Sequence, residues 1–156
     1  MKKFFLVSAT FMICALFTCC NNLQWSNKAP YAMRWNDAVN YCKNLNENGH
    51  NDWRLPAINE LRTLITNNPN TETGGSCKVG EKKGQLSFND IKNCVGNDNN
   101  GQNKLGDSDW FWSSSNFSAP DNPNYASNHA WSVIFSNGAV YEAHKSLDSL
   151  YVRCVR

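Results

Sequence analysis

Residues 131–141 read Trp-Ser-Val-Ile-Phe-Ser-Asn-Gly-Ala-Val-Tyr. Two sets of side chains alternate along the first half of this stretch: Trp131, Val133 and Phe135 against Ser132, Ile134 and Ser136. Asn137-Gly138 is typical of a two-residue hairpin turn, because both residues adopt positive φ there. Such a turn places Ser136 opposite Ala139, Phe135 opposite Val140 and Ile134 opposite Tyr141. We therefore expect a β-hairpin whose Trp131 face lies in the core and whose other face is exposed.

Shorter extended segments are expected on both sides of this hairpin. Leu23 and Trp25 alternate with polar neighbours, so they predict a first short strand. Phe111-Trp112 leads into a loop rich in Ser, Asn and Pro, and Tyr151–Arg156 predicts a terminal strand. The last third of the chain is therefore expected to be mainly β-structure.

A short amphipathic helix is expected near the start of the domain. Asn36 is its predicted N-cap, with Asp37 in the first turn, and Asn48-Gly49 ends it. Four side chains recur at helical spacing on its inner face: Ala38, Tyr41, Cys42 and Leu45.

A second short helix is expected after Trp53-Arg54-Leu55, which runs extended into Pro56. Its inward side chains are those of Ile58, Leu61, Leu64 and Ile65, and Asn67-Asn68-Pro69 stops it. From Thr71 to Asp109 Gly and Asn dominate, and periodicity returns only around Leu86-Ser87-Phe88. That composition predicts a long irregular loop.

The first 20 residues read as an export signal. Lys2-Lys3 precede an apolar run from Phe4 to Phe17 that is too short to span a bilayer comfortably. Cys19 or Cys20 after this run resembles a bacterial lipoprotein site, where the cysteine takes the lipid; an ordinary signal peptide is the alternative. We expect residues 1–20 to be the signal and residues 21–156 to be one exported, lipid-anchored domain, displayed on the cell surface.

The number of cysteines bears on the lipid site and on disulfides. Leu16 lies three residues before Cys19, as the lipoprotein pattern prefers, and this favours Cys19 as the lipidated residue. Lipidation of Cys20 would instead leave an even number of cysteines for disulfides in an oxidising compartment. That even set is Cys42, Cys77, Cys94 and Cys154. Of three pairings we favour Cys42 with Cys154, which ties a helix to the last strand, and Cys77 with Cys94, which closes a short loop. No C-x-x-C pair occurs, so zinc is the weaker alternative and no metal is expected.

Length and charge exclude several classes of protein. A chain of 156 residues with 41% hydrophobic residues has room for one compact domain. The formal charge is +2, and both surplus lysines are Lys2 and Lys3 in the signal. A neutral mature domain is a poor candidate for nucleic-acid binding, and it also disfavours a sulfated polymer as ligand.

Eight sequence blocks stand in the order found in a known domain family. They are Trp35-Asn36-Asp37-Ala38, Tyr41-Cys42, Gly49 through Pro56, Glu60-Leu61, Trp112-Ser113-Ser114-Ser115, Ala130-Trp131, Phe135-Ser136-Asn137-Gly138 and Val152-Arg153-Cys154-Val155-Arg156. On these blocks the chain resembles the bacterial family typified by the C-terminal domain of the collagen-like adhesin Lcl. The resemblance covers almost all of the mature chain.

This resemblance implies an α+β fold of C-type-lectin-like type. In that fold two short helices pack on a small mixed or antiparallel sheet beside a long irregular loop region, and the first helix is bridged to the last strand. Ala57 departs from the family, which usually has a hydroxyl cap before Glu60, so the capping box of the second helix is weakened. A ligand-binding or adhesion role without catalysis or cofactor is implied, with a protein or glycan ligand on another cell or in the environment.

A narrower resemblance concerns target proteins of diversity-generating retroelements, in which mutated Asn codons vary the C-terminal third. Residues on and after the outer hairpin face form a chemically mixed run that fits such codons, although Glu142 cannot arise from them. An ordinary solvated hairpin is the alternative. A varied surface on a rigid support suits ligand binding. The predicted ligand-contact residues are Ser132, Ile134, Ser136, Ala139, Tyr141, Ala143, His144, Ser146, Leu147 and Asp148.

Other chemistry is less favoured by the sequence. The Arg54-Leu55-Pro56 and Arg153-Cys154-Val155 blocks also resemble formylglycine-generating enzymes, but those use a reactive cysteine pair. His50, His129 and His144 show no paired spacing for a metal and no nucleophile to activate.

The sequence also gives little support to calcium binding or to stacking of tryptophans on a carbohydrate. Trp35-Asn36-Asp37 and Asp121–Asn124 could offer oxygen ligands to calcium, but helix capping and a turn explain them. Trp53, Trp110, Trp112 and Trp131 are expected to fill the core rather than to stack on a sugar. Arg153 and Arg156 are expected to form ion pairs or to face solvent. A fixed-specificity glycan adhesin remains an alternative.

Overall fold

The computed structural model describes residues 23–81, 88–97, 103–118 and 122–156. The predicted export signal, the lipid site at Cys19 or Cys20, Leu86-Ser87 and Asp121 lie outside the described residues. Within them, no helix combines the length and the apolar character needed to cross a bilayer.

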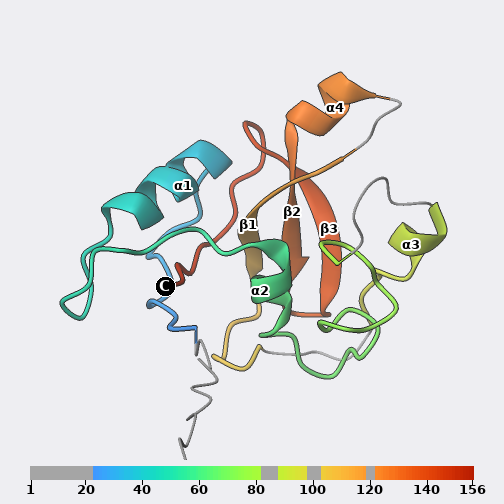
Figure 1. The fold of residues 1–156 in the computed structure, drawn as a ribbon, viewed down its shortest axis with the longest axis horizontal. Helices are drawn as coiled ribbons and strands as arrows, with labels where there is room; N and C mark the ends of the chain where they lie inside the picture. Colours follow the sequence, from blue (N-terminus) through green and yellow to red (C-terminus); the bar gives the residue numbers. More distant parts are fainter. Residues whose placement is uncertain (1–22, 82–87, 98–102, 119–121) are drawn as a thin grey trace, which may run out of the picture.

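The described chain forms a small α+β domain, as the sequence predicts (Figure 1). Its elements are α1 (Trp35–Asn44), α2 (Ile58–Arg62), α3 (Phe88–Lys92), β1 (Trp110–Asn116), α4 (Pro123–Ser127), β2 (His129–Ile134) and β3 (Ala139–His144). The three strands form one antiparallel sheet in the order β1-β2-β3. In Figure 1, α2 lies in front of this sheet, α1 lies to one side and α4 stands at the upper end.

The β2–β3 hairpin has the predicted strands but a different register. Ile134 pairs with Ala139, Val133 with Val140 and Ser132 with Tyr141. The loop therefore has four residues, and the two-residue turn prediction is wrong. Gly138 alone has positive φ in this loop, its N–H donates to Ile134 O (2.8 Å), and Asn137 Oδ1 accepts from Ala139 N (3.0 Å). Because the shift is two residues, every side chain of the paired strands keeps its predicted face.

The first helix begins two residues earlier than predicted. Its N-cap is Arg34, which makes no side-chain cap bond, so the N-cap prediction for Asn36 is wrong. The N–H of Trp35 instead donates to Lys145 O (3.1 Å), and its indole Nε1 donates to Ser113 O (2.8 Å). Packing of this tryptophan therefore sets the start of α1, in place of a capping side chain.

The second helix is shorter than predicted. After Arg62 the chain continues in tight turns, in which Leu64 N donates to Leu61 O and Ile65 N donates to Arg62 O (both 3.1 Å). As expected, Ala57 supplies only half of a capping box, because its N–H donates to Glu60 Oε2 (2.8 Å) but it has no side-chain oxygen. Ser115 Oγ on β1 accepts from Ile58 N (3.0 Å) and provides the missing hydroxyl.

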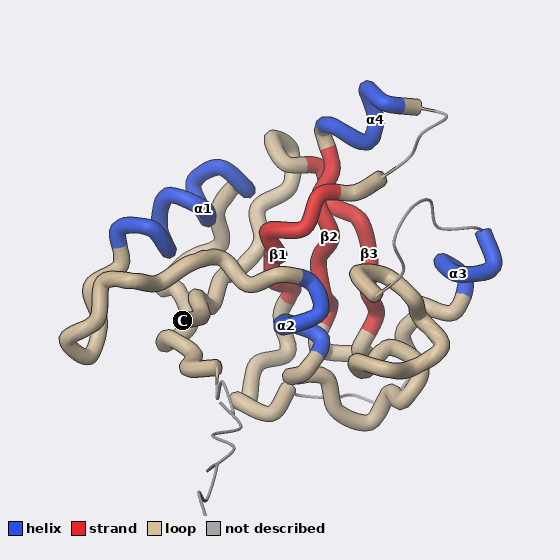
Figure 2. Tube along the Cα trace, in the orientation of Figure 1, coloured by secondary structure: helices blue, strands red, loops and turns tan. Residues whose placement is uncertain are grey.

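The two ends of the domain pair with each other. Gln24 and Arg156 exchange two backbone hydrogen bonds of 3.1 Å, and Met33 and Leu150 exchange two of 2.9 and 3.0 Å. These segments form isolated bridges, not the regular strands predicted at Leu23–Trp25 and Tyr151–Arg156, so Figure 2 shows them as loops.

Side chains are buried on both faces of the sheet. Neighbouring Phe111 and Trp112 on β1 point to opposite faces, and both are fully buried. Trp112 belongs to the α1 cluster with Met33, Ala38, Cys42, Leu150 and Cys154. Phe111 belongs to the α2 cluster with Ile58, Leu61, Cys77, Cys94 and Trp131. The fully exposed outer hairpin face that the sequence predicts is therefore absent.

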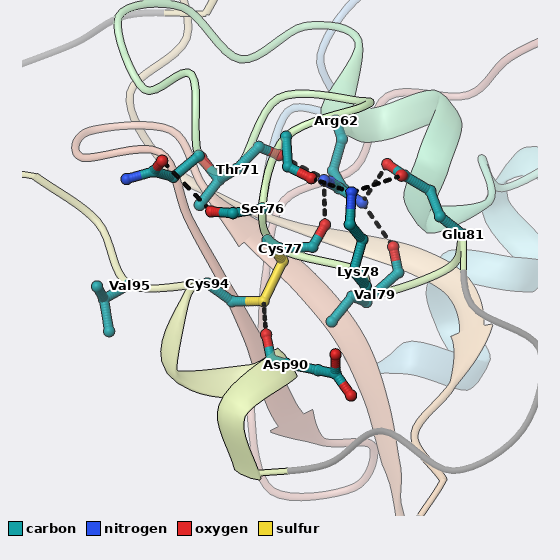
Figure 3. Close-up of a disulfide and its surroundings, with 12 residues drawn as sticks. Arg62, Thr71, Ser76, Cys77, Lys78, Val79, Glu81, Asp90, Cys94 and Val95 are labelled. Carbon is teal, nitrogen blue, oxygen red and sulfur yellow. Dashed lines mark hydrogen bonds and ion pairs between the residues drawn. A yellow bond between two sulfur atoms is a disulfide. The ribbon is translucent and has the colours of Figure 1, made fainter.

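The protein contains both predicted disulfides, Cys42–Cys154 and Cys77–Cys94. Beside the second one, the fully buried Arg62 organises the loop that follows α2 (Figure 3). Its guanidinium donates to Thr71 O (2.7 Å), Val79 O (2.6 Å), Cys77 O (2.7 Å) and Glu72 O (2.8 Å), and it lies 3.0 Å from Glu81 Oε1. Burial lowers the pKa of Arg62, and the Glu81 carboxylate opposes that change.

Candidate functional site

The candidate site is the sheet face that carries Trp112 and Tyr141. Strand pairing places its side chains in two cross-strand rows: Trp110, Ile134 and Ala139 in one, and Trp112, Ser132 and Tyr141 in the next. The α1 cluster covers part of this face through Trp112, whose indole Nε1 donates to Met33 O (2.8 Å). Exposure therefore changes from one position to the next along the hairpin.

Three of the predicted ligand-contact residues are buried. Ser132 has no exposed surface, and its Oγ donates to Tyr141 O (2.8 Å). Ala139 and Ala143 are also buried, and Ala143 belongs to the α1 cluster. The expectation that these three side chains face outward is wrong, because residues far away in sequence cover the middle of the face.

The other predicted residues are exposed in different places. Tyr141 is 54% exposed and Leu147 is 75% exposed, while Ser136 and Ser146 are also exposed. Ile134 is half-buried and lies diagonally across from Tyr141. His144 is on the opposite face, and its backbone N–H donates to Asp148 Oδ2 (2.6 Å), so Asp148 has a structural partner.

Trp110 joins this surface, although the sequence analysis expected it in the core. It is 40% exposed and pairs with Ile134, whereas Trp53, Trp112 and Trp131 are buried as expected. A shallow cavity of about 540 Å³ lies between Trp110, Ser136, Ser149 and Tyr151. We call Trp110, Ile134, Ser136 and Tyr141 the hairpin surface. No sequence signal separated Trp110 from Trp112, since both have the same alternation and only the reach of the α1 cluster distinguishes them.

One ion pair borders this cavity. Lys28 Nζ lies 2.8 Å from Asp109 Oδ2 and 4.6 Å from the centroid of the Tyr151 ring. The hydrogen bond to Asp109 raises the pKa of Lys28. Lys28 therefore stays cationic and holds the N-terminal segment beside the cavity.

Histidine and aromatic side chains gather at the other end of the sheet, beside α4. Tyr125 stacks on His129 with ring centroids 3.8 Å apart, and His129 meets His144 edge-on at 4.9 Å. The structure thus brings together two of the three histidines, while His50 lies in a tight turn with Glu47. No group of three or more His, Cys, Asp or Glu side chains that could hold a metal is found among the described residues.

The calcium candidates have structural roles in the described part of the chain. Asn122 is the N-cap of α4, and its Oδ1 accepts from Tyr125 N (3.1 Å). Asn36 and Asp37 lie in the first turn of α1.

Both C-terminal arginines form ion pairs, as predicted. Arg153 holds Asp107 through Nε (2.6 Å) and Nη2 (3.0 Å), and it donates to Ser26 O (2.7 Å). Arg156 holds Asp52 at 2.8 Å, and this bond lowers the pKa of Asp52. Neither guanidinium is left as an unpaired anion site.

The family model of the Lcl C-terminal domain matches residues 19–156. The chain belongs to the Lcl C-terminal domain family. Membership confirms the sequence resemblance and indicates a surface or adhesion-type domain. No curated protein matches this family member significantly. The matched residues include the hairpin surface and both disulfides.

Proposed function

We propose that this domain is an exported, lipid-anchored module that binds a protein ligand through the hairpin surface and has no catalytic activity. The observation that carries the proposal is the exposure of Trp110 and Tyr141 on a sheet that is packed on both faces. Large aromatic side chains on a rigid support lose little conformational entropy on binding, and they often dominate the energy of protein interfaces.

The surroundings of these two aromatics suit a protein partner. The cavity beside Trp110 is shallow and is lined by the hydroxyls of Ser136, Ser149 and Tyr151. Aromatic and polar side chains therefore line it together, a mixture that is common at protein interfaces. Asp109 and Lys28 neutralise each other at its edge, so charge contributes little to the attraction.

Diversification of the C-terminal third is part of this proposal, but over fewer positions than the sequence suggested. Exposed Ser136, Tyr141, Ser146 and Leu147 can change side chain without disturbing the core. Buried Ser132, Ala139 and Ala143 have no room for larger residues. Diversification would be supported by a second DNA copy of this region, lying beside a reverse transcriptase gene and differing from the first chiefly where the copy has adenine. If the flanking DNA holds no such copy, the domain has one fixed ligand.

A C-type-lectin-like arrangement of the domain is also proposed from the family resemblance, supported by α1 being joined to the C-terminal residues through Cys42–Cys154. An oxidoreductase related to formylglycine-generating enzymes is the alternative from another class. The pairing of all four described cysteines argues against the reactive pair that such an enzyme needs. Titration of free thiols in the exported protein separates the two, because a reactive pair would favour the enzyme.

The binding proposal is tested by selecting peptides from a phage-displayed random library against the oxidised protein. Trp110→Ser/Tyr141→Ser should weaken the selected peptides by roughly 30-fold or more, because each side chain is expected to be a hot spot. Tyr31→Ser is the matched control, since Tyr31 is 62% exposed but does not belong to the hairpin surface. Equal binding to the double variant would refute the proposal, as would selective binding of glycans instead of peptides at this surface.

A further inference from the structure

A second cavity lies between α1 and the extended segment that leads into α2. Trp35, Val39 and Lys43 form its α1 wall, at a spacing of four residues on one side of the helix. Trp53, Arg54, Leu55 and Ser114 line the rest of it. We call this cavity the α1 pocket. Figure 1 shows the extended segment running below α1 on its way to α2.

The pocket has the size and lining of a small-molecule site. Its volume is about 410 Å³, and apolar side chains supply most of its surface. Both indole N–H groups are already used, since Trp35 Nε1 donates to Ser113 O (2.8 Å) and Trp53 Nε1 donates to His50 O (3.1 Å). Neither ring therefore leaves a buried donor unsatisfied. Trp35 is partly exposed and offers most of the aromatic surface, while Trp53 is 5% exposed and offers only an edge of its ring.

Its walls are held in place before any ligand binds. Cys42–Cys154 fixes α1 to the C-terminal residues, and Ser114 N donates to Pro56 O (2.7 Å) behind the extended segment. A pocket whose walls need no rearrangement loses less binding free energy to ordering of the protein.

The charge around the pocket is positive. Lys43 is exposed, and within the described residues it has no ion-pair partner. Arg54 is engaged by both oxygens of Glu60 (2.6 and 2.5 Å), and Arg156 near Trp53 is engaged by Asp52. Lys145 Nζ lies 4.7 Å from the centroid of the Trp35 ring, without a carboxylate partner there. Lys43 and Lys145 thus leave a net attraction for an anion.

We propose that the α1 pocket binds an amphipathic organic anion, with a flat apolar body between Trp35 and Trp53 and a carboxylate that pairs with Lys43. A cation would be repelled at the rim, and the pocket offers too few free hydrogen-bonding groups for a ligand rich in hydroxyls. This site shares no residue with the hairpin surface, so it stands or falls independently of the proposed function.

The test compares 1-naphthaleneacetate with its neutral analogue 1-naphthaleneacetamide, by NMR titration of the oxidised protein. The indole N–H signals of Trp35 and Trp53 should shift in a saturable way with both probes. The anion should bind about fivefold more tightly, the range of one exposed ion pair. Lys43→Gln should reduce the affinity for the anion to that for the amide and leave the amide unchanged. Lys92→Gln on α3 makes the same charge change at a distant exposed site and should have no effect.

Val39→Trp fills the pocket and should abolish binding of both probes. If Val39→Trp impairs folding, Lys43→Gln still tests the proposal, because it changes only an exposed charge. The proposal is overturned if neither probe binds, if both bind equally, or if the Trp110 signal shifts in place of the other two. It is also overturned if sedimentation shows a dimer that Val39→Trp dissociates, because a second copy of the chain would then occupy the pocket.

Discussion

Cys42–Cys154 joins α1 to the C-terminal residues, whereas Cys77–Cys94 joins the loop after α2 to the turn at the end of α3. The first bond lies among other long-range contacts, including the paired termini and the packing of Trp112 on Met33. The second lies beside the buried Arg62, which binds four backbone carbonyls of the loop. The α1 region is thus ordered mainly by apolar packing, and the loop region by one polar side chain and one covalent bond.

The difference shows how residues 71–81 are held in place without regular secondary structure. Buried carbonyl groups need hydrogen-bond donors. A loop that forms no helix or sheet must obtain these donors from side chains or from other segments. Arg62 supplies five N–H donors from a single buried position.

Arg62→Met should cause the largest loss, about 5 kcal/mol of unfolding free energy, because three buried hydrogen bonds to carbonyls, one partly buried hydrogen bond and the ion pair with Glu81 are lost. Urea denaturation followed by circular dichroism measures it. Arg54→Met is the matched control and should cost less than about 1 kcal/mol, since the Arg54 side chain is 52% exposed. Similar losses for both variants would show that the loop does not depend on Arg62.

Removing the two disulfides should give unequal losses. The bonds span 112 and 17 residues, so the chain-entropy model predicts about 4.7 kcal/mol for Cys42→Ser/Cys154→Ser and about 3 kcal/mol for Cys77→Ser/Cys94→Ser. Thermal unfolding of each double variant measures the stability. A larger loss for Cys77→Ser/Cys94→Ser would contradict this prediction. It would mean that contacts between the two ends of the domain already restrict the unfolded chain, and that the loop depends more on its disulfide.

Ser132→Leu and Ser136→Leu make the same change at two positions of the hairpin. Ser132 is fully buried and donates to Tyr141 O, so overpacking and the lost bond should cost about 1–3 kcal/mol. Ser136 is exposed, and its change should stay within about 0.5 kcal/mol. Chemical denaturation of both variants checks this, and equal losses would contradict the division of the face into buried and exposed positions.

The smallest effect is expected at Glu60, where the extended segment meets α2. Its bond to Arg54 lowers the pKa of Glu60 below the ordinary value of 4.5. The stabilisation is therefore complete above pH 4.5 and is lost as pH falls through the lowered pKa. Because the pair is partly exposed, it contributes less than about 1 kcal/mol. Glu60→Gln keeps the bond to Ala57 N but should abolish this acid-dependent loss in a pH series of thermal melts; an unchanged loss would assign it to other carboxylates.

The hairpin shows how far the sequence predicts this fold. Alternation correctly assigned every side chain from residue 131 to residue 134 to its face, because a shift of two residues preserves that assignment. It did not predict the four-residue loop, in which Asn137 accepts a bond from Ala139. The tertiary environment outweighed the local turn preference. Phe135 is buried, and its ring centroid lies 5.2 Å from that of Phe111.

The helix boundaries show the same limit. Asn36 has the composition of an N-cap, but α1 starts at Trp35 because Lys145 and Ser113, each more than 70 residues away, accept its two N–H groups. Ser115 likewise supplies the hydroxyl that Ala57 lacks. No local pattern contains these partners.

The sequence alone determined the α+β composition and the alternation of the hairpin, because these depend on local periodicity. It also limited the four cysteines to three pairings, of which the structure contains the favoured one. The tertiary structure decided which aromatic side chains are exposed, since Trp110 and Trp112 differ only in whether the α1 cluster reaches them. It also gave Arg62 its role, because the carbonyls that it binds come together only when the loop folds back on α2. Exposure and long-range hydrogen bonding depend on partners that are distant along the chain.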